Sequence, residues 1–246
     1  MTTAKSKFEV ASQTYAKAAK KLEHRLPDPQ IQTEEQSEQL IGLGVAIDWT
    51  RRASHLHPLN YASKFLNKSA RSPGVTEMVR FNLAWSGMNA LFSRPSILDL
   101  FGGTTAKSEL QRFRFIFGKA GLNAATVADH ESTLQQLLAI HINTRVPGVP
   151  AGQTVTTLHS LFYKYTPADV QNMATGKVIR NALTSGNFAA LDLPLLIYAM
   201  RNWSVHGGII GSSFRSDTRF DMYIGTVQMA LADVHETLAK TLLTIV

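Results

Sequence analysis

One stretch decides the fold class of this 246-residue chain: Glu77-Met-Val-Arg-Phe-Asn-Leu-Ala-Trp-Ser-Gly-Met-Asn-Ala-Leu-Phe92. Its large apolar residues recur mainly at intervals of three and four, which is typical of an α-helix rather than a strand. They are Val79, Leu83, Trp85, Met88, Leu91 and Phe92. From Thr76 onward the pattern predicts one of the strongest helices in the chain, and we expect it to cross the hydrophobic core.

Helical patterns also precede this stretch. Apolar residues at helical spacing run from Phe8 to Leu26, and Pro27-Asp28-Pro29 stops them. Thr33, followed by several acidic residues, predicts the start of a second helix that reaches about Arg52, although Gly42 and Gly44 weaken its pattern. A short helix is expected over 59–69, and the sequence Ser-Pro-Gly at 72–74 is the clearest break in this part of the chain.

More helices are expected after the central stretch, over 108–120, 126–141, 166–183, 193–205 and from Thr218 or Arg219 to about Leu243. Gly102-Gly103 predicts a turn, and the proline- and glycine-rich segment 144–153 predicts a loop. Residues 155–165 fit a strand by their Val, Thr and Tyr content and a short helix by their leucine spacing. We choose the helix for this segment.

These patterns together predict an all-α fold, a bundle of about seven to nine helices. The break near residue 72 divides the chain into an N-terminal helical extension, residues 1–72, and a larger helical domain, residues 73–246. Neither part contains an internal repeat or a low-complexity tract.

The composition is that of a globular protein, with 44% hydrophobic and 17% charged residues. A formal charge of +7 favours an anionic partner, with nucleic acid first and an anionic membrane surface second. The alternative is a moderately basic protein whose lysines are simply solvated.

Several classes of site and location are excluded or disfavoured by composition. The chain has no cysteine, which excludes disulfides, thiol nucleophiles and cysteine-ligated metal sites. Its N-terminus lacks the apolar run of a signal peptide. The apolar run from Leu193 to Met200 contains Pro194 and is far shorter than the roughly 20 residues that cross a bilayer. We therefore expect a soluble, cytoplasmic protein with no membrane association.

The segment Tyr198-Ala-Met-Arg-Asn-Trp-Ser-Val-His-Gly-Gly208 contains the main candidate for a functional site. It places Arg201, Asn202 and His206 before paired glycines. Metal-free RNA cleavage needs a group that transfers protons and a fixed positive charge at the phosphate, and histidine and arginine supply them. Arg52 and His57 have the same spacing, but the later pair follows an apolar helical run and precedes a final long helix.

The pattern of arginine, polar residue and histidine resembles the active-site motif of the HEPN superfamily of helical proteins. The helix over 77–92 is a second, looser point of similarity, although Met88-Asn89 stands where the family usually has a supporting acidic residue. The resemblance implies a homodimer in which two motif helices line one cleft. It also implies a metal-independent endoribonuclease that leaves 2′,3′-cyclic phosphate and 5′-hydroxyl ends.

On this interpretation, three side chains are catalytic. His206 takes the 2′-hydroxyl proton or protonates the leaving oxygen, Arg201 holds the scissile phosphate, and Asn202 orients the phosphate or the histidine. The structural alternative is that Arg201 pairs with a carboxylate and His206 caps a helix. The carboxylates considered for that pairing are Asp192, Asp217 and Asp221.

Further substrate contacts are predicted at Ser204, Arg215 and Arg219, where the arginines would bind flanking phosphates. Each also has an ordinary interpretation, as a tolerated helical serine and as surface charge. We expect no cofactor and no metal ion.

Two other clusters have weaker functional patterns. Arg51-Arg52 with His55 and His57 could hold phosphate or metal, but no carboxylate or third histidine is suitably spaced, so we predict a solvated helix end. The segment from Gly102 to Lys107 lacks the first glycine and the spacing of a phosphate-binding loop, and we predict a turn.

The sequence thus favours an RNA-cleaving toxin or phage-defence effector. The first alternative is a non-catalytic HEPN-like subunit that binds nucleic acid or assembles a defence or toxin–antitoxin complex. The second is a helical enzyme that acts on a small phosphorylated molecule.

Overall fold

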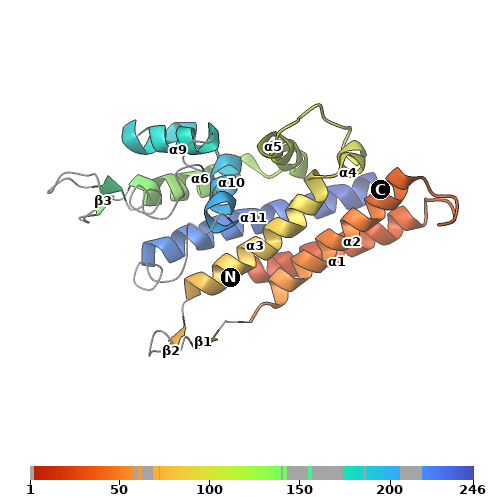
Figure 1. Cartoon of the computed structure of the whole chain (residues 1–246), viewed down its shortest axis with the longest axis horizontal. Coiled ribbons are helices and arrows are strands. Elements are labelled where there is room, and N and C mark those ends of the chain that lie inside the picture. The colour runs from red at the N-terminus through yellow and green to blue at the C-terminus, as the bar shows by residue number, and fades with distance from the viewer. Residues whose placement is uncertain are drawn as a thin grey trace. The chain divides into compact units, whose positions relative to one another are not determined.

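The protein is an all-α multi-helix bundle, seen here in a computed structural model (Figure 1). The structure describes residues 3–57, 60–62, 69–71, 73–139, 141–142, 155–156, 174–185, 187–205 and 218–246. The predicted fold class is confirmed.

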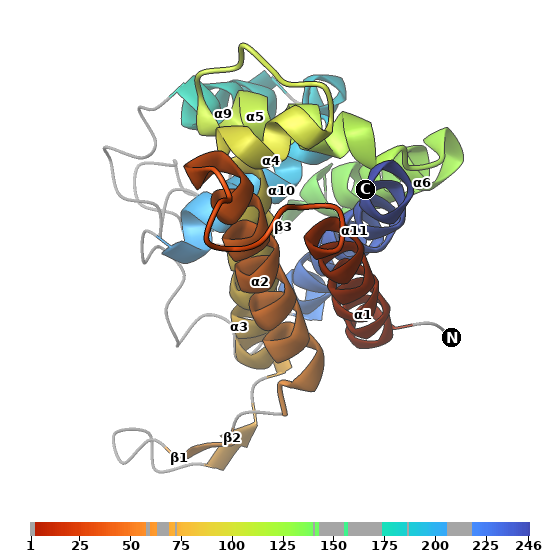
Figure 2. The same ribbon diagram turned by 90° about the vertical axis from the view of Figure 1, so that its right-hand side faces the viewer.

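Helices make up most of the described elements. They are α1 (Ala4–Glu23), α2 (Glu34–His55), α3 (Pro73–Phe92), α4 (Pro95–Leu100), α5 (Glu109–Ala120), α6 (Ala124–Ala139), α9 (Ala174–Ser185), the 3-10 helix η1 (Phe188–Ala190), α10 (Leu193–Val205) and α11 (Thr218–Ile245). Two short antiparallel strand pairs accompany them, β1 (Asn60–Ala62) with β2 (Ser69–Arg71) and β3 (His141–Ile142) with β4 (Val155–Thr156). Figure 2 shows the β1–β2 pair.

The chain divides into two compact units, and each is discontinuous in sequence. Unit 1 comprises Met1–His57, Val79–Asn123 and Gln228–Val246, and unit 2 comprises Pro58–Met78 and Ala124–Val227. Each unit is therefore built from separate segments of the chain, whereas the sequence predicts two continuous domains that meet at residue 72. The extension over residues 1–72 stays a prediction.

In unit 1, α1 and α2 lie side by side, as both views show (Figure 1 and Figure 2). Each begins with a capping box, in which Thr3 and Thr33 exchange hydrogen bonds with Ser6 and Gln36 three residues later. These bonds satisfy backbone N–H groups that the first turn of a helix leaves without partners. The buried apolar residues of α1 include Phe8, Ala11, Tyr15, Ala18 and Leu22.

His235 joins three helices of unit 1. Its Nε2 lies 2.9 Å from the carbonyl oxygen of Ala84 on α3, and its Nδ1 lies 3.3 Å from the hydroxyl of Tyr15 on α1. Because a carbonyl can only accept, Nε2 carries the proton and Nδ1 accepts from Tyr15. Burial lowers the pKa of His235 to about 4, against the opposing effect of the bond to Ala84, so this imidazole is neutral at pH 7.

An aromatic cluster packs α3 against α5. The ring of Trp85 lies 4.8 Å from Phe113 and 5.6 Å from Phe92, measured between centroids, and both contacts are edge-to-face. Trp85, Phe92 and Phe113 are all buried. The helix predicted from the central stretch therefore does contribute to the core, although Val79 and Leu83 are only half-buried.

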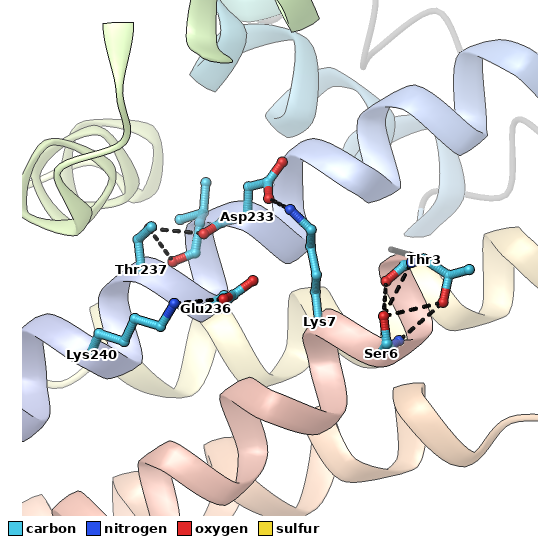
Figure 3. A network of polar contacts seen from close by, with 8 residues as sticks. Thr3, Ser6, Lys7, Asp233, Glu236, Thr237 and Lys240 are labelled. Atoms are coloured by element: carbon cyan, nitrogen blue, oxygen red, sulfur yellow. Dashed lines mark hydrogen bonds and ion pairs between the residues drawn. The ribbon is translucent and has the colours of Figure 1, made fainter. Parts of the chain in front are cut away.

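Charged side chains tie other helices of unit 1 together. Arg80 is 6% exposed, and its two terminal nitrogens donate to the carbonyls of Ala53 (2.7 Å) and Leu56 (3.2 Å) at the C-terminal end of α2. Lys7 on α1 forms an ion pair with Asp233 on α11 (Figure 3). Neither contact follows from local sequence pattern, because the partners are far apart along the chain.

Two glycines allow α2 to approach its neighbours closely. A Cβ on Gly87 of α3 would lie 2.8 Å from Thr50 Oγ1 and 3.2 Å from the carbonyl oxygen of Ala46. A Cβ on Gly42 would lie 2.4 Å from Ile97 Cδ1, whereas nothing lies within 4 Å of the same position on Gly44. Gly42 therefore does not interrupt α2. Its missing side chain leaves room for Ile97 of α4 to pack against α2.

Several predicted elements need correction. The helix expected over 59–69 is wrong, because Asn60–Ala62 and Ser69–Arg71 pair as antiparallel strands. The helix chosen for 155–165 is wrong at its start, where Val155–Thr156 pairs with His141–Ile142, so the β-propensity of the segment prevails there. The rest of that segment, the loop 144–153 and the first residues of the helix expected over 166–183 lie outside the described residues.

The ends of the observed helices differ from the predicted ends more than the positions of the helices differ. α1 begins at Ala4 and α3 at Pro73, earlier than expected, and the short helix α4 was not predicted. The turn at Gly102-Gly103 is confirmed, since both residues adopt positive φ angles of 94° and 69°. Among the described helices, none combines the length and apolar character needed to span a membrane.

Candidate functional site

The candidate motif lies on α10, which belongs to unit 2 together with α6, α9 and η1. Two carboxylates fix the start of α10. Asp192 Oδ1 accepts the N–H of Leu195 at 3.0 Å, and Glu131 Oε1, from α6, accepts the N–H of Leu193 at 2.8 Å. Negative groups at this end of a helix also complement its dipole. The prediction of a helix over 193–205 is confirmed.

Most side chains of α10 are buried, and this determines which residues can reach a ligand. The buried residues include Leu193, Leu195, Leu196, Ile197, Ala199, Met200 and Asn202. Tyr198, Arg201 and Ser204 are half-buried, and Val205 is exposed. At about 100° per residue, Tyr198, Arg201 and Val205 fall within a narrow arc of the helix. We call these three residues and Ser204 the open stripe of α10.

Arg201 is held by residues of its own helix. Its Nη1 donates to Oδ1 of Asn202 at 2.9 Å, and its guanidinium carbon lies 5.8 Å from the centre of the Tyr198 ring. Asn202 is 7% exposed, so its amide is part of the packed interior while the arginine lies at the edge of it. The Nε of Arg201 is buried, and the side chain as a whole is half-buried at the open stripe.

The Oδ1 of Asn202 accepts a hydrogen bond from Arg201. The predicted role of Asn202, to orient the phosphate or the histidine, stays a prediction. Ser204 donates its hydroxyl to the carbonyl of Arg201 at 2.9 Å, a back-bond one turn along the helix. This bond is consistent with the ordinary interpretation of Ser204 as a tolerated helical residue.

One of the carboxylates proposed as a structural partner of Arg201 has another role. Asp192 caps α10, nine residues before Arg201, which corresponds to a rise of roughly 13 Å along the helix. Asp217 and the side chain of Asp221 lie outside the described residues.

The remaining predicted site residues lie at the edge of the described chain. His206 follows Val205 directly in sequence, and it lies outside the described residues, as do Gly207, Gly208 and Arg215. Arg219 is in the first turn of α11, but its side chain is not among those described. The structure therefore brings together Arg201, Asn202 and Ser204.

Two contacts at this site were not predicted from the sequence. The first joins Tyr198 and Arg201, and a ring three residues before an arginine on a helix is positioned to meet it. Glu131 could not be found by spacing, because it comes from another helix. Its bond to Leu193 is a tertiary contact.

The other basic cluster is a solvated helix end, as expected. Arg51 and Arg52 both bind Asp48, at 3.2 Å and 2.8 Å, and both arginine side chains are largely exposed. The hydrogen bond from Arg52 holds the pKa of Asp48 below its ordinary value. A carboxylate four residues before an arginine is a spacing that the sequence does display. Among the described residues, no group of three or more His, Asp or Glu side chains could hold a metal ion.

Arg201 supplies a guanidinium, and the paired N–H donors of such a group match the oxygens of a phosphate. A search of protein-family models, of curated proteins and of solved structures finds no match to this chain.

Proposed function

We propose that this protein is a metal-independent endoribonuclease of HEPN type, in which Arg201 binds the scissile phosphate and His206 transfers protons. The observation that carries the proposal is the placement of Arg201. A half-buried guanidinium lies on the open stripe of α10, held by Asn202 and five residues before a histidine. The net charge of +7 suits a polyanionic substrate.

The proposed reaction needs no external reactant. The ribose 2′-oxygen attacks the adjacent phosphorus as its proton passes to a histidine, and the bond from phosphorus to the 5′-oxygen breaks as that oxygen gains a proton. The products carry a 2′,3′-cyclic phosphate and a 5′-hydroxyl group. Arg201 stabilises the charge that develops on the phosphorane oxygens.

A homodimer suits this chemistry, because two histidines can then divide the roles of base and acid. Five residues along a helix correspond to about 140° of rotation and roughly 7.5 Å of rise, so one continuous helix does not aim Arg201 and His206 at one phosphate. A second copy of the motif supplies the missing group. On this proposal the protein acts in the cytoplasm as a toxin or defence effector, with an antitoxin or complex partner controlling it.

The test is cleavage of end-labelled RNA in excess EDTA by the wild type, Arg201→Ala and His206→Ala, with analysis of the product ends. The matched controls are Arg52→Ala and His57→Ala, which remove the other arginine–histidine pair of the same spacing. We expect cyclic phosphate ends from the wild type and both controls. We expect a loss of at least about 10²-fold to 10³-fold in each motif variant.

Other outcomes decide between the alternatives. RNA binding without cleavage in every variant would favour the non-catalytic subunit. Tight binding of a small phosphorylated molecule without RNA turnover would favour the helical enzyme that acts on such a molecule. Equal loss of cleavage in the control variants would contradict the assignment to α10. DNA of the same sequence should resist the enzyme, because it lacks the 2′-hydroxyl group.

A further inference from the structure

Tyr198 and Asn202 lie one turn apart on α10, and the guanidinium of Arg201 contacts both. On a helix, positions 198 and 202 differ by about 40° in direction, and position 201 lies beside them. The guanidinium carbon is 5.8 Å from the Tyr198 ring centre, and Nη1 is 2.9 Å from Asn202 Oδ1. The three residues form a contact set within a single helix.

The two contacts constrain different features of the arginine. The ring limits where the guanidinium carbon can lie, and the amide oxygen fixes the direction of one terminal nitrogen. Asn202 is itself held by burial. A side chain with four rotatable bonds is thereby restricted before any ligand arrives, which lowers the entropy cost of binding.

These contacts also add no negative charge. A phenol ring and an amide oxygen are neutral at pH 7, whereas a carboxylate in either position would neutralise the guanidinium that it orients. These two contacts therefore do not reduce the attraction of the guanidinium for phosphate.

We propose that Tyr198 is a positioning residue, which together with Asn202 holds Arg201 in the orientation that binds the scissile phosphate. This inference rests on the proposed function for its effect on catalysis. The contact set itself can be measured without RNA.

The first measurement is a double-mutant cycle in RNA cleavage. Tyr198→Leu should lower kcat about tenfold with little change in KM, and Tyr198→Phe should stay within about twofold of the wild type, because phenylalanine keeps the ring. In the Arg201→Ala background, Tyr198→Leu should have no further effect. Tyr198→Met replaces Tyr198→Leu if the leucine variant does not fold by circular dichroism.

The second measurement is independent of activity. The Nε–Hε NMR signal of Arg201, assigned with Arg201→Lys, should move when Tyr198 becomes leucine and stay near its wild-type position with phenylalanine, because the ring current is then kept. An Arg201 signal that does not move in Tyr198→Leu overturns the inference. An equal loss of kcat from Tyr198→Leu in the wild type and in the Arg201→Ala variant overturns it as well. Absence of cleavage in the wild type overturns the proposed function instead, and the NMR result then decides the positioning role alone.

Discussion

Arg80 in unit 1 and Arg201 in unit 2 are arginines on long helices, but their guanidinium groups have different surroundings. Arg80 is buried, and its terminal nitrogens bond to main-chain carbonyls at the end of another helix. Arg201 is half-buried, and two of its contacts are with side chains of its own helix, Asn202 and Tyr198. Bonds between helices stabilise packing, whereas the two contacts within α10 restrict the orientation of a half-buried group.

His235, like Arg80, has surroundings that suit a structural role. It is buried and bonded to two helices, and its lowered pKa keeps it neutral at pH 7. Such a group is suited to holding a core together, not to exchanging protons with a substrate.

The largest expected effect is on RNA cleavage, when Arg201 is replaced. Arg201→Lys retains the charge but loses the planar fork, so we expect RNA cleavage to fall roughly 10²-fold to 10³-fold. The melting temperature should stay within about 2 °C of the wild type, because the side chain is not deeply buried. Single-turnover cleavage and thermal unfolding measure the two quantities. A large loss of stability would place Arg201 with Arg80 as a structural residue.

Arg80→Ala should show the opposite behaviour. It removes the donors to the carbonyls of Ala53 and Leu56, and we expect the free energy of unfolding to fall by about 2–3 kcal/mol. Arg80→Lys, which keeps one charged donor, should recover part of this loss. Urea unfolding followed by circular dichroism measures both variants. A change below about 0.5 kcal/mol for Arg80→Ala would mean that the bonds to α2 contribute little.

His235 predicts a pH dependence of stability. Its folded pKa of about 4 lies below the ordinary 6.5, so the unfolded chain binds more protons between these values. The stabilisation is complete above pH 6.5 and is lost as the pH falls towards 4. Between pH 7.5 and pH 5 the loss should be about 2 kcal/mol.

The control for this dependence is a pair of variants. His235→Gln should remove that part of the pH dependence, whereas His24→Gln, at an exposed position, should retain it. Urea unfolding at the two pH values measures each variant. Identical pH dependence in the wild type and His235→Gln would show that the imidazole titrates normally in the fold.

The smallest expected effects come from two glycines. Gly87→Ala forces a shift of Thr50 or of the α2 backbone and should lower the free energy of unfolding by about 1–2 kcal/mol. Gly44→Ala meets no atom within 4 Å and should raise it by about 0.5–1 kcal/mol, through helix propensity. Denaturant unfolding compares the two. Equal effects of the same sign would show that the close approach at Gly87 does not constrain the packing.

The sequence by itself determined the elements with strong local causes. The apolar spacing of α1 and α3 predicts helices there, and Thr33 marks the start of α2. The all-α class follows from such patterns, since each depends only on residues within a few turns. The candidate residues Arg201 and Asn202 were also found in this way.

Only the tertiary structure decided what distant residues do for one another. The bond from His235 to Ala84, the capping of α2 by Arg80 and the anchoring of α10 by Glu131 join residues far apart in sequence. The strand pairs at residues 60–71 and 141–156 depend on partners that local propensity does not reveal. Burial is a property of the folded surroundings. For that reason the sequence identified Arg201 as a candidate, whereas the fold shows that Arg80 is buried and Arg201 only half-buried.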